Sequence, residues 1–353
     1  MSADRGERRG ERIGIVMLTA AGDAVHVLPL LNALKRQDSG RHLTWVVQPG
    51  PATLVRGHPA IDDLVVFDRS RGWRAFAALR HELATRPFDI VLDLQSYLKA
   101  GIITWMTRAP VKLGYDRARA KDLNWLFTTQ QIPPRPPRHI QDEYFEFLDV
   151  LQVSAEPVEW GLGPWPHELE RQQEIVARFQ PPYVPLVVGS SKREKDWLPE
   201  RWAEVAGALE SDFGLQPVIV GARTPREVDL ERLVLARCAR AVSALDSGLR
   251  PLVGILDAAA LVVSLDTGPL HMSVALGRPV VSLIGYTDPR RTGPYRRFGD
   301  LVVDAFHEPG EEGPVTTGTR HGRMPRITVR DVLERVERWQ ASYDRAESPR
   351  PNS

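Results

Sequence analysis

Cysteine is almost absent from this chain, since Cys238 is the only one in 353 residues. One thiol excludes an intramolecular disulfide and a thiolate metal cluster. Apolar runs are also short, and none approaches the ~18 residues that a helix needs to cross a bilayer. The first twelve residues, MSADRGERRGER, lack the apolar stretch of a secretory signal. We therefore expect a cytoplasmic protein.

An excess of one charge is missing too, because 46 Lys and Arg face 45 Asp and Glu. Proteins that bind nucleic acid usually carry a basic excess, so we expect no nucleic-acid partner. No G-x-G-x-x-G follows the first apolar segment, and G-x-x-x-x-G-K-[ST] does not occur, which argues against a dinucleotide dehydrogenase or a P-loop enzyme. No His, Cys or carboxylate cluster has the spacing of a metal site. We expect neither a metal nor a cofactor.

Short apolar segments alternate with helical patterns along the whole chain, which predicts parallel sheets covered on both faces. The length suits two domains rather than one. A segment rich in Pro, Gly and Trp, SAEPVEWGLGPWPHELE, marks a linker. We expect an α/β protein with two Rossmann-like α/β/α domains, residues 1–160 and 161–327, followed by a final helix and a disordered tail over 328–353. Ligands of such sheets bind beyond the carboxyl ends of the strands.

The segment DTGPLHM, residues 266–272, follows a buried strand and begins a helix. Pro269 suits a first helical turn because it has no N–H to lose there, and Gly268 lets a ligand approach the backbone. Hydrogen bonds from free amides and the helix dipole would both favour an anion. An isolated Asp-Thr-Gly would favour a simple helix cap, but the Gly-Pro-x-His continuation favours phosphate binding. The predicted phosphate-binding residues are Asp266, Thr267, Gly268, Pro269, Leu270 and His271, with free amides at Leu270, His271 and Met272.

A second candidate lies in SSKREKDW, which follows the first apolar strand of the second half. Its lysines could neutralise a departing diphosphate, although a solvated charge run explains them equally well. Glu227, at the start of a later helix, could accept from a ribose hydroxyl or simply complement the helix dipole. The candidates here are Ser190, Ser191, Lys192, Lys195 and Glu227.

Asp23 lies where the first predicted strand gives way to a helix, in LTAAGDAVHVLPLLNALKR. A helix cap is the commoner role for such an aspartate. Its place beyond the carboxyl end of a strand also suits a general base facing the ligand.

Several blocks occur in the order found in family 9 glycosyltransferases, the lipopolysaccharide heptosyltransferase family. They are GDAVHVLPLLNALKR, FDIVLDLQSYLKAG, KLGYDRARAKD, SSKREKDWLPERWAEVAGAL and DTGPLHMSVALGRPVVSLIGYTDPRRTGP. The chain resembles this family from about Arg12 to its final helix, and the D-T-G-P-x-H block and the early G-D are the most specific parts.

The resemblance implies a GT-B fold, in which the two parallel sheets face a central cleft, the first domain binds the acceptor and the second binds the nucleotide sugar. It implies transfer with inversion and without a metal, from a donor such as ADP-heptose to a lipopolysaccharide core. By the same resemblance Asp23 would be the general base and Lys195 would contact phosphate. The diphosphate would be held by Asp266, Thr267, Gly268 and His271.

Three positions depart from the family pattern and leave the donor open: Leu265 stands before the D-T-G, Met272-Ser273-Val274 replaces a run of alanines, and Tyr286 stands in place of a proline. The alternatives are a GT-B enzyme that uses another nucleotide sugar, as a transferase or an epimerase, or a nucleotide-sugar-binding module without turnover.

An anionic glycan or glycolipid acceptor would need cations, and KLGYDRARAKD offers Arg117, Arg119 and Lys121 as acceptor-binding residues. The helical pattern GWRAFAALRHELATR places Trp73, Phe76, Leu79 and Leu83 on one face. A core-facing stripe is our first interpretation of that pattern, and peripheral contact with the inner membrane is the second.

Overall fold

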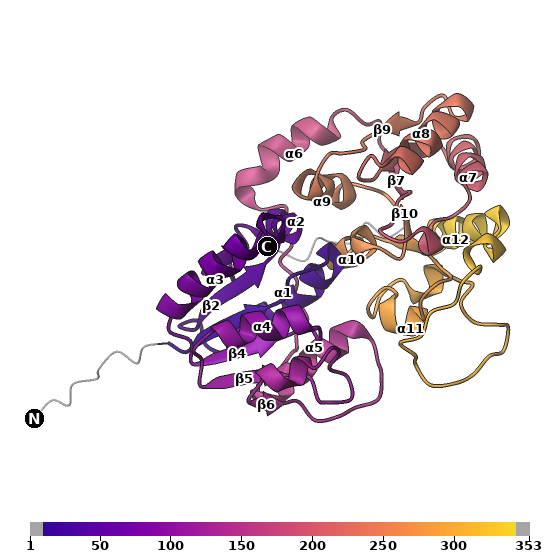
Figure 1. The fold of residues 1–353 in the computed structure, drawn as a ribbon. Coiled ribbons are helices and arrows are strands. Elements are labelled where there is room, and N and C mark those ends of the chain that lie inside the picture. The colour runs from indigo at the N-terminus through magenta and orange to yellow at the C-terminus, as the bar shows by residue number, and fades with distance from the viewer. Residues whose placement is uncertain (1–9, 344–353) are drawn as a thin grey trace, which may run out of the picture. The chain divides into compact units, whose positions relative to one another are not determined.

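The computed structural model describes residues 10–343, which form two compact units of parallel sheet and helix (Figure 1). The first unit runs to Pro136 and resumes over Gln141–Gly161. The second unit takes Pro137–Ile140 and the chain from Leu162 onward. The tail predicted to be disordered, residues 345–353, lies outside the described residues.

The sheet of the first unit has six parallel strands in the order β3-β2-β1-β4-β5-β6. β1, β2 and β4 are almost wholly buried, as expected for central strands covered by helices on both faces. The strands are β1 (Arg12–Val16), β2 (His42–Val47), β3 (Asp63–Val66), β4 (Ile90–Asp93), β5 (Val111–Gly114) and β6 (Gln130–Gln131).

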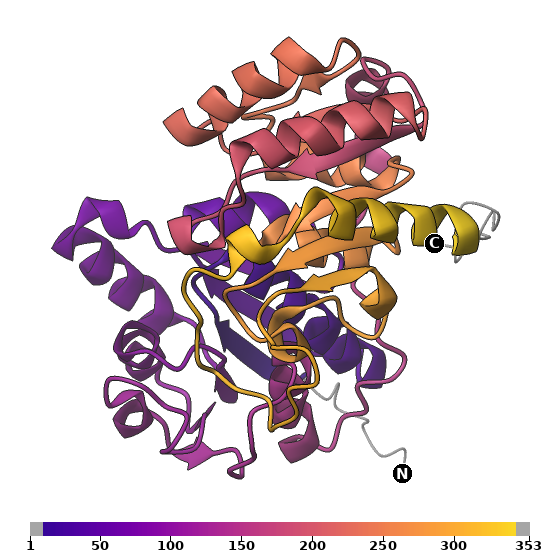
Figure 2. The same cartoon turned by 90° about the vertical axis from the view of Figure 1, so that its right-hand side faces the viewer.

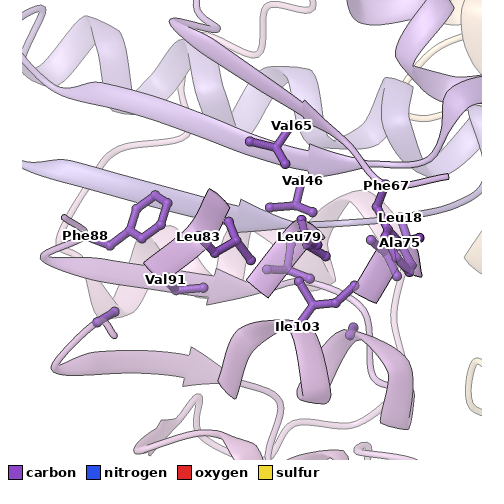
Figure 3. Packing of buried hydrophobic residues seen from close by; sticks show 13 residues of the cluster. Leu18, Val46, Val65, Phe67, Ala75, Leu79, Leu83, Phe88, Val91 and Ile103 are labelled. Atoms are coloured by element: carbon purple, nitrogen blue, oxygen red, sulfur yellow. The ribbon is translucent and has the colours of Figure 1, made fainter. Parts of the chain in front are cut away.

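Helices follow most of these strands, namely α1 (Ala21–Gln37), α2 (Pro49–Val55), α3 (Trp73–Thr85), α4 (Leu98–Met106) and α5 (Ile140–Val150), with the 3₁₀ turns η1 (Arg69–Arg71) and η2 (Asn124–Phe127). α3 and α4 turn Leu79, Leu83 and Ile103 inward, where they pack with Val46 and Val91 of the sheet (Figure 3). The core-facing interpretation of the α3 pattern is therefore confirmed for Leu79 and Leu83.

The sheet of the second unit also has six parallel strands, in the order β12-β11-β10-β7-β8-β9. The strands are β7 (Tyr183–Val187), β8 (Gln216–Val220), β9 (Val242–Ser243), β10 (Val262–Leu265), β11 (Val280–Ile284) and β12 (Val302–Asp304). The helices are α6 (Leu169–Val176), α7 (Pro199–Ser211), α8 (Pro225–Arg237), α9 (Leu249–Asp257), α10 (Gly268–Ala275), α11 (Pro289–Thr292) and α12 (Val329–Ser342), with four 3₁₀ turns, η3 (Pro166–Glu168), η4 (Arg193–Lys195), η5 (Gly299–Leu301) and η6 (Met324–Arg326).

The final helix belongs to the second unit. Thr328 accepts a hydrogen bond from the amide of Asp331 at the start of α12, as its predicted capping role requires. Val332, Val336 and Trp339 are buried where α12 packs on α7, β11 and β12 (Figure 2). Within residues 10–343, none of the helices has the length and apolar character needed to span a membrane.

Candidate functional site

The start of α10 is shaped by the change from a fully buried strand to a helix. β10 ends at Leu265, Thr267 is extended as the N-cap residue, and Pro269 lies in the first turn. The Thr267 hydroxyl makes no capping bond and instead donates to the Leu265 carbonyl at 3.4 Å. A simple side-chain cap by Thr267 is therefore not what the structure contains.

The Leu270 amide is already used, because it donates to the Thr267 carbonyl at 3.1 Å. This corrects the prediction of a free amide there. The tight first turn brings an N–H within reach of the carbonyl three residues earlier, as helix ends commonly do. His271 follows on the same turn and is buried.

Asp266 is the centre of a polar cluster beside the start of α10. Its carboxylate Oδ2 accepts from Lys195 Nζ at 2.8 Å and from the Thr292 hydroxyl at 3.1 Å, and the Thr287 hydroxyl donates to the same oxygen. Lys195 Nζ also donates to the Asp266 carbonyl at 3.0 Å. The side chain of Asp266 is 6 % exposed and that of Lys195 is 19 % exposed. The structure thus brings together two predicted site residues from segments 71 positions apart.

The positive charge of Lys195 is balanced by the negative charge of Asp266 in this cluster. An ammonium group has three N–H donors, and the contacts to Asp266 use two of them. A diphosphate arriving at Lys195 would add negative charge at a cation that one buried carboxylate already orients. The sequence analysis did not single out Thr287 and Thr292, although both lie in the quoted block GYTDPRRTGP.

The loop after β7 carries three more of the predicted residues, Ser190, Ser191 and Lys192. The Ser190 hydroxyl donates to Asp196 Oδ1 at 2.8 Å, and Asp196 in turn pairs with Arg226 of α8. Ser191 and Lys192 are exposed, and Lys192 Nζ lies 5.3 Å from the centre of the Tyr286 ring. The cation therefore rests on the ring that replaces the family's proline.

Glu227 has a clear structural role at the start of α8. Its Oε2 accepts from the Thr224 amide at 2.6 Å and its Oε1 accepts from the Ala222 amide at 3.2 Å. The carboxylate also fills the space above Gly189 and Gly221, where an added Cβ would come 1.6 and 2.6 Å from Oε1. Glu227 is thus the third residue of a capping box at the start of α8, which is consistent with the structural alternative to ribose binding, and contact with a ribose stays a prediction.

In the first unit, Asp23 lies in the first turn of α1 rather than at the N-cap, which is Ala20. Its Oδ2 accepts from the Ala20 amide at 2.8 Å, and its Oδ1 accepts from the Tyr144 hydroxyl at 3.2 Å. Burial and the neighbouring Asp23 charge hold the pKa of Tyr144 well above its ordinary value, so the phenol stays protonated and donates. Tyr144, which comes from α5, is a residue that the sequence analysis missed.

The three predicted acceptor cations fall into two groups. Arg117 and Lys121 are exposed: Arg117 lies 4.4 Å from the Trp125 ring centre, and Lys121 Nζ lies 3.4 Å from the Tyr97 hydroxyl. Arg119 instead points into the unit, where it pairs with Asp116 and Glu146 and donates to the Pro133 carbonyl at 2.9 Å. Its guanidinium is committed to internal partners.

Asp93, at the end of β4, is a further buried carboxyl near these loops. It accepts from Asn124 Nδ2 at 2.9 Å and from the Thr104 hydroxyl at 3.1 Å. Burial raises its pKa to about 7, against the opposing effect of these hydrogen bonds. Asn124 also donates to the Tyr97 carbonyl at 3.0 Å, so Asp93 anchors the segments that carry Tyr97 and Lys121.

Comparison with known proteins gives one consistent match. The model of the family described as glycosyltransferase family 9 (heptosyltransferase) matches residues 76–307. The chain is 27% identical to the lipopolysaccharide core heptosyltransferase OpsX of Haemophilus influenzae, over 92% of this chain and 95% of that protein.

Two solved structures share the fold. The glycosyl transferase family 9 protein of Veillonella parvula matches with a TM-score of 0.78 and 22% identity, over 93% of this chain and 96% of that one. The Escherichia coli heptosyltransferase WaaC with ADP matches with a TM-score of 0.74 and 23% identity, over 95% and 100% of the two chains. The predicted fold class is confirmed: two six-stranded parallel sheets of the GT-B type.

Proposed function

Because the chain belongs to glycosyltransferase family 9, we propose that this glycosyltransferase moves heptose from ADP-heptose to the core of lipopolysaccharide. Its relatives are lipopolysaccharide heptosyltransferases, which supports the sugar and the acceptor. The adenine nucleotide is supported by the neighbour whose structure contains ADP. One observation in this chain carries the proposal, namely the Lys195 ammonium held by Asp266 beside the start of α10.

We assign the donor to the second unit. Lys195 and the positive end of the α10 dipole are the groups that would take up charge on the departing diphosphate. Thr267, Gly268 and His271 lie at the same helix start, and Ser190, Ser191 and Lys192 lie in the loop of the neighbouring strand β7. Glu227, whose carboxylate lies beside Gly189 after β7 and Gly221 after β8, is the candidate for binding the ribose hydroxyls.

We assign the acceptor to the first unit, with Asp23 as the general base. Its carboxylate would remove the proton of the attacking hydroxyl while that oxygen bonds to the anomeric carbon and the bond to ADP breaks. Attack from the face opposite the leaving group inverts the anomeric centre. Tyr144 would keep Asp23 oriented through its hydrogen bond. Arg117 and Lys121 would hold anionic groups of the acceptor.

A thermal-shift panel with ADP, GDP, UDP and TDP tests the donor. A ligand that binds only the folded protein raises the melting temperature by mass action. We expect the largest shift with ADP, and loss of that shift in Lys195→Ala but not in Lys112→Ala, a lysine of the first unit. A larger shift with another nucleotide would replace the donor, and no shift with any of them would favour the non-catalytic alternative.

A further inference from the structure

The carboxylate oxygen Oδ2 of Asp266 receives hydrogen bonds from three side chains. Lys195 Nζ donates to it at 2.8 Å, the Thr292 hydroxyl donates at 3.1 Å, and the Thr287 hydroxyl donates as well. The Thr292 hydroxyl also lies 3.0 Å from the Thr287 hydroxyl and 3.4 Å from the Asp288 carbonyl. A hydroxyl has one proton to donate, and the two nearer acceptors of Thr292 both lead to Asp266, directly or through Thr287.

This cluster is built from the ends of three neighbouring strands. In the second sheet β11, β10 and β7 lie next to one another in that order. Asp266 follows the central strand β10, Lys195 lies in the loop after β7, and Thr287 follows β11. Thr292 is the last residue of the short helix α11. Asp266 therefore receives its cation from one neighbouring strand and its two hydroxyls from the segment that follows the other.

The segment that carries the two threonines is itself held in place. Asp288, which is buried, caps α11 by accepting from the Arg290 amide at 3.0 Å. Its other oxygen pairs with the Arg290 guanidinium at 2.7 Å and accepts from the Thr316 amide at 3.1 Å. Thr287 also forms an antiparallel bridge with Thr319. These contacts fix the backbone from which both hydroxyls reach Asp266.

The orientation of Asp266 decides where Lys195 presents its charge. Lys195 Nζ donates to both the carboxylate and the carbonyl of Asp266. Because an ammonium group is tetrahedral and has three N–H donors, two fixed directions also fix the third. The χ2 torsion of an aspartate is broad, so the carboxylate by itself does not keep one plane. The threonine hydroxyls restrict that rotation, and they thereby restrict the direction of the third N–H of Lys195.

A simpler explanation is that the threonines only satisfy a buried carboxylate. Asp93 of the first unit offers a comparison, because it accepts from the Thr104 hydroxyl at 3.1 Å, the distance that also separates Thr292 from Asp266. The donors to Asp93 are that hydroxyl, a side-chain amide and a backbone amide. At Asp266 a cation shares the oxygen with the hydroxyls, so holding the carboxylate also holds a charge.

We propose that Thr287 and Thr292 are positioning residues for the diphosphate of the donor. They hold the Asp266 carboxylate, which in turn directs the Lys195 ammonium toward the phosphates. This inference rests on the proposed function because it concerns the same donor site. It does not depend on which sugar is transferred or on the acceptor.

Calorimetric titration of the full-length protein with ADP tests the proposal. Thr287→Val and Thr292→Val each remove a hydroxyl and keep the branched shape of the side chain. We expect each to weaken ADP binding about fivefold, which is what a hydrogen bond of ordinary strength is worth. Thr287→Ser and Thr292→Ser keep the hydroxyl and should bind ADP within about twofold of the wild type. Wild-type affinity in both valine variants, or serine variants as weak as the valine variants, would overturn the proposal.

Thr104→Val is the matched control. It removes a hydroxyl from a buried carboxylate at the same distance, and Thr104 is itself fully buried. This variant should lower the melting temperature at least as much as the other valine variants and leave ADP affinity unchanged. An equal loss of ADP affinity in Thr104→Val would show that lost stability explains the effect, and the proposal would fall.

The effect should also require Lys195. In Lys195→Ala, titrated at millimolar ADP, the addition of Thr287→Val should change ADP affinity by less than about twofold, because the cation that the hydroxyl positions is gone. A further loss of about fivefold in this background would mean that Thr287 acts on ADP without Lys195, against the proposal.

The outcomes separate this inference from the proposed function. If another nucleotide binds better than ADP, the same differences are expected with that nucleotide, and only the donor changes. If no nucleotide binds the wild type, the proposed function and this inference both fail. If the wild type binds ADP and the valine variants bind it equally well, only this inference fails.

Discussion

At the scale of single residues, Asp23 has one observed role and one proposed role, and the two can be separated. Its side chain accepts from the amide of Ala20 at 2.8 Å, which is a structural role, and we assign it the acceptor proton as well. Asp331 offers a comparison without a proposed role in catalysis, because it lies at the same position of α12 and accepts from the Thr328 amide at 2.8 Å.

Asp23→Asn should lower the rate of transfer by about 10²–10⁴, the usual contribution of a general base. Affinity for ADP should stay within about twofold, because the donor is assigned to the other unit. Steady-state kinetics with calorimetry for ADP measures both quantities. Asp331→Asn should reproduce any loss of stability but not the loss of rate. An ADP affinity that falls as far as the rate would make Asp23 a donor ligand rather than the base.

Asp93 predicts a pH dependence of stability. Burial raises its pKa from the ordinary 3.8 to about 7. Between those values the folded protein keeps a proton that the unfolded chain releases, so the free energy of unfolding falls as pH rises through this window and levels off above it. Urea unfolding of the wild type and of Asp93→Asn at pH 5 and pH 8 measures the effect. From pH 5 to pH 8 the free energy of unfolding of the wild type should fall by about 3 kcal/mol relative to that of the variant. An unchanged difference would contradict the assignment.

At the scale of elements, the carboxylate of Glu227 packs against Gly189 and Gly221, which follow β7 and β8. Gly189→Ala would place a Cβ 1.6 Å from Glu227 Oε1, so the carboxylate has to leave the amides of Ala222 and Thr224. We expect a loss of about 1–3 kcal/mol in the free energy of unfolding and weaker ADP binding. The matched control is Gly207→Ala in α7, where the added Cβ meets no atom within 4 Å. Chemical denaturation should show Gly207→Ala as neutral or stabilising by up to about 1 kcal/mol. Equal effects at the two glycines would contradict this account.

In the segment after β5, we assign acceptor binding to Arg117 and Lys121 and a role in stability to Arg119. Arg117→Ala with Lys121→Ala should raise KM for the acceptor about tenfold and leave stability unchanged, because both side chains are exposed. Arg119→Ala removes a cation from Asp116 and Glu146 and should cost about 3 kcal/mol in the free energy of unfolding. Kinetics and denaturation of the two variants check this. A destabilised Arg117/Lys121 variant, or a stable Arg119 variant, would reverse the two roles.

The elements that the sequence predicted are those with long periodic patterns. α1 and α3 lie, to within one residue, inside the segments LTAAGDAVHVLPLLNALKR and GWRAFAALRHELATR for which we predicted helices, because apolar spacing specifies which side is buried. α2 was missed, since Pro49 and Pro51 bracket its first turn and resemble a turn signal. β5 and β6 were missed because Lys112 and the glutamines of β6 interrupt the apolar run. The interpretation of residues 154–170 as a linker overlooked α6, which begins at Leu169.

The candidate site was predictable only in part, for a similar reason. Local motifs pointed to Asp266 and Lys195, but the contact between them depends on β7 and β10 being neighbours in the sheet. Tyr144 reaches Asp23 across 121 positions, and no local pattern carries that information. The pairing of Arg119 with Asp116 and Glu146 could not be predicted either. Arg117, Arg119 and Lys121 are three closely spaced cations in one loop, and nothing in the local sequence indicates which of them points inward.

At the scale of the whole molecule, each unit has its own sheet, its own core and its own set of proposed ligand residues. Arg117 and Lys121 of the first unit would meet the acceptor, while Lys195 of the second unit would meet the donor. We propose that this one protein transfers sugar between these two substrates, so the most direct test of the proposal uses both.

That test is ADP release by the wild-type protein from ADP-heptose, measured with and without heptose-deficient lipopolysaccharide, together with the anomeric configuration of the product by NMR. We expect ADP release to require the acceptor, and we expect the product to carry heptose with inverted configuration. Release without acceptor, or a product with retained configuration, would contradict it.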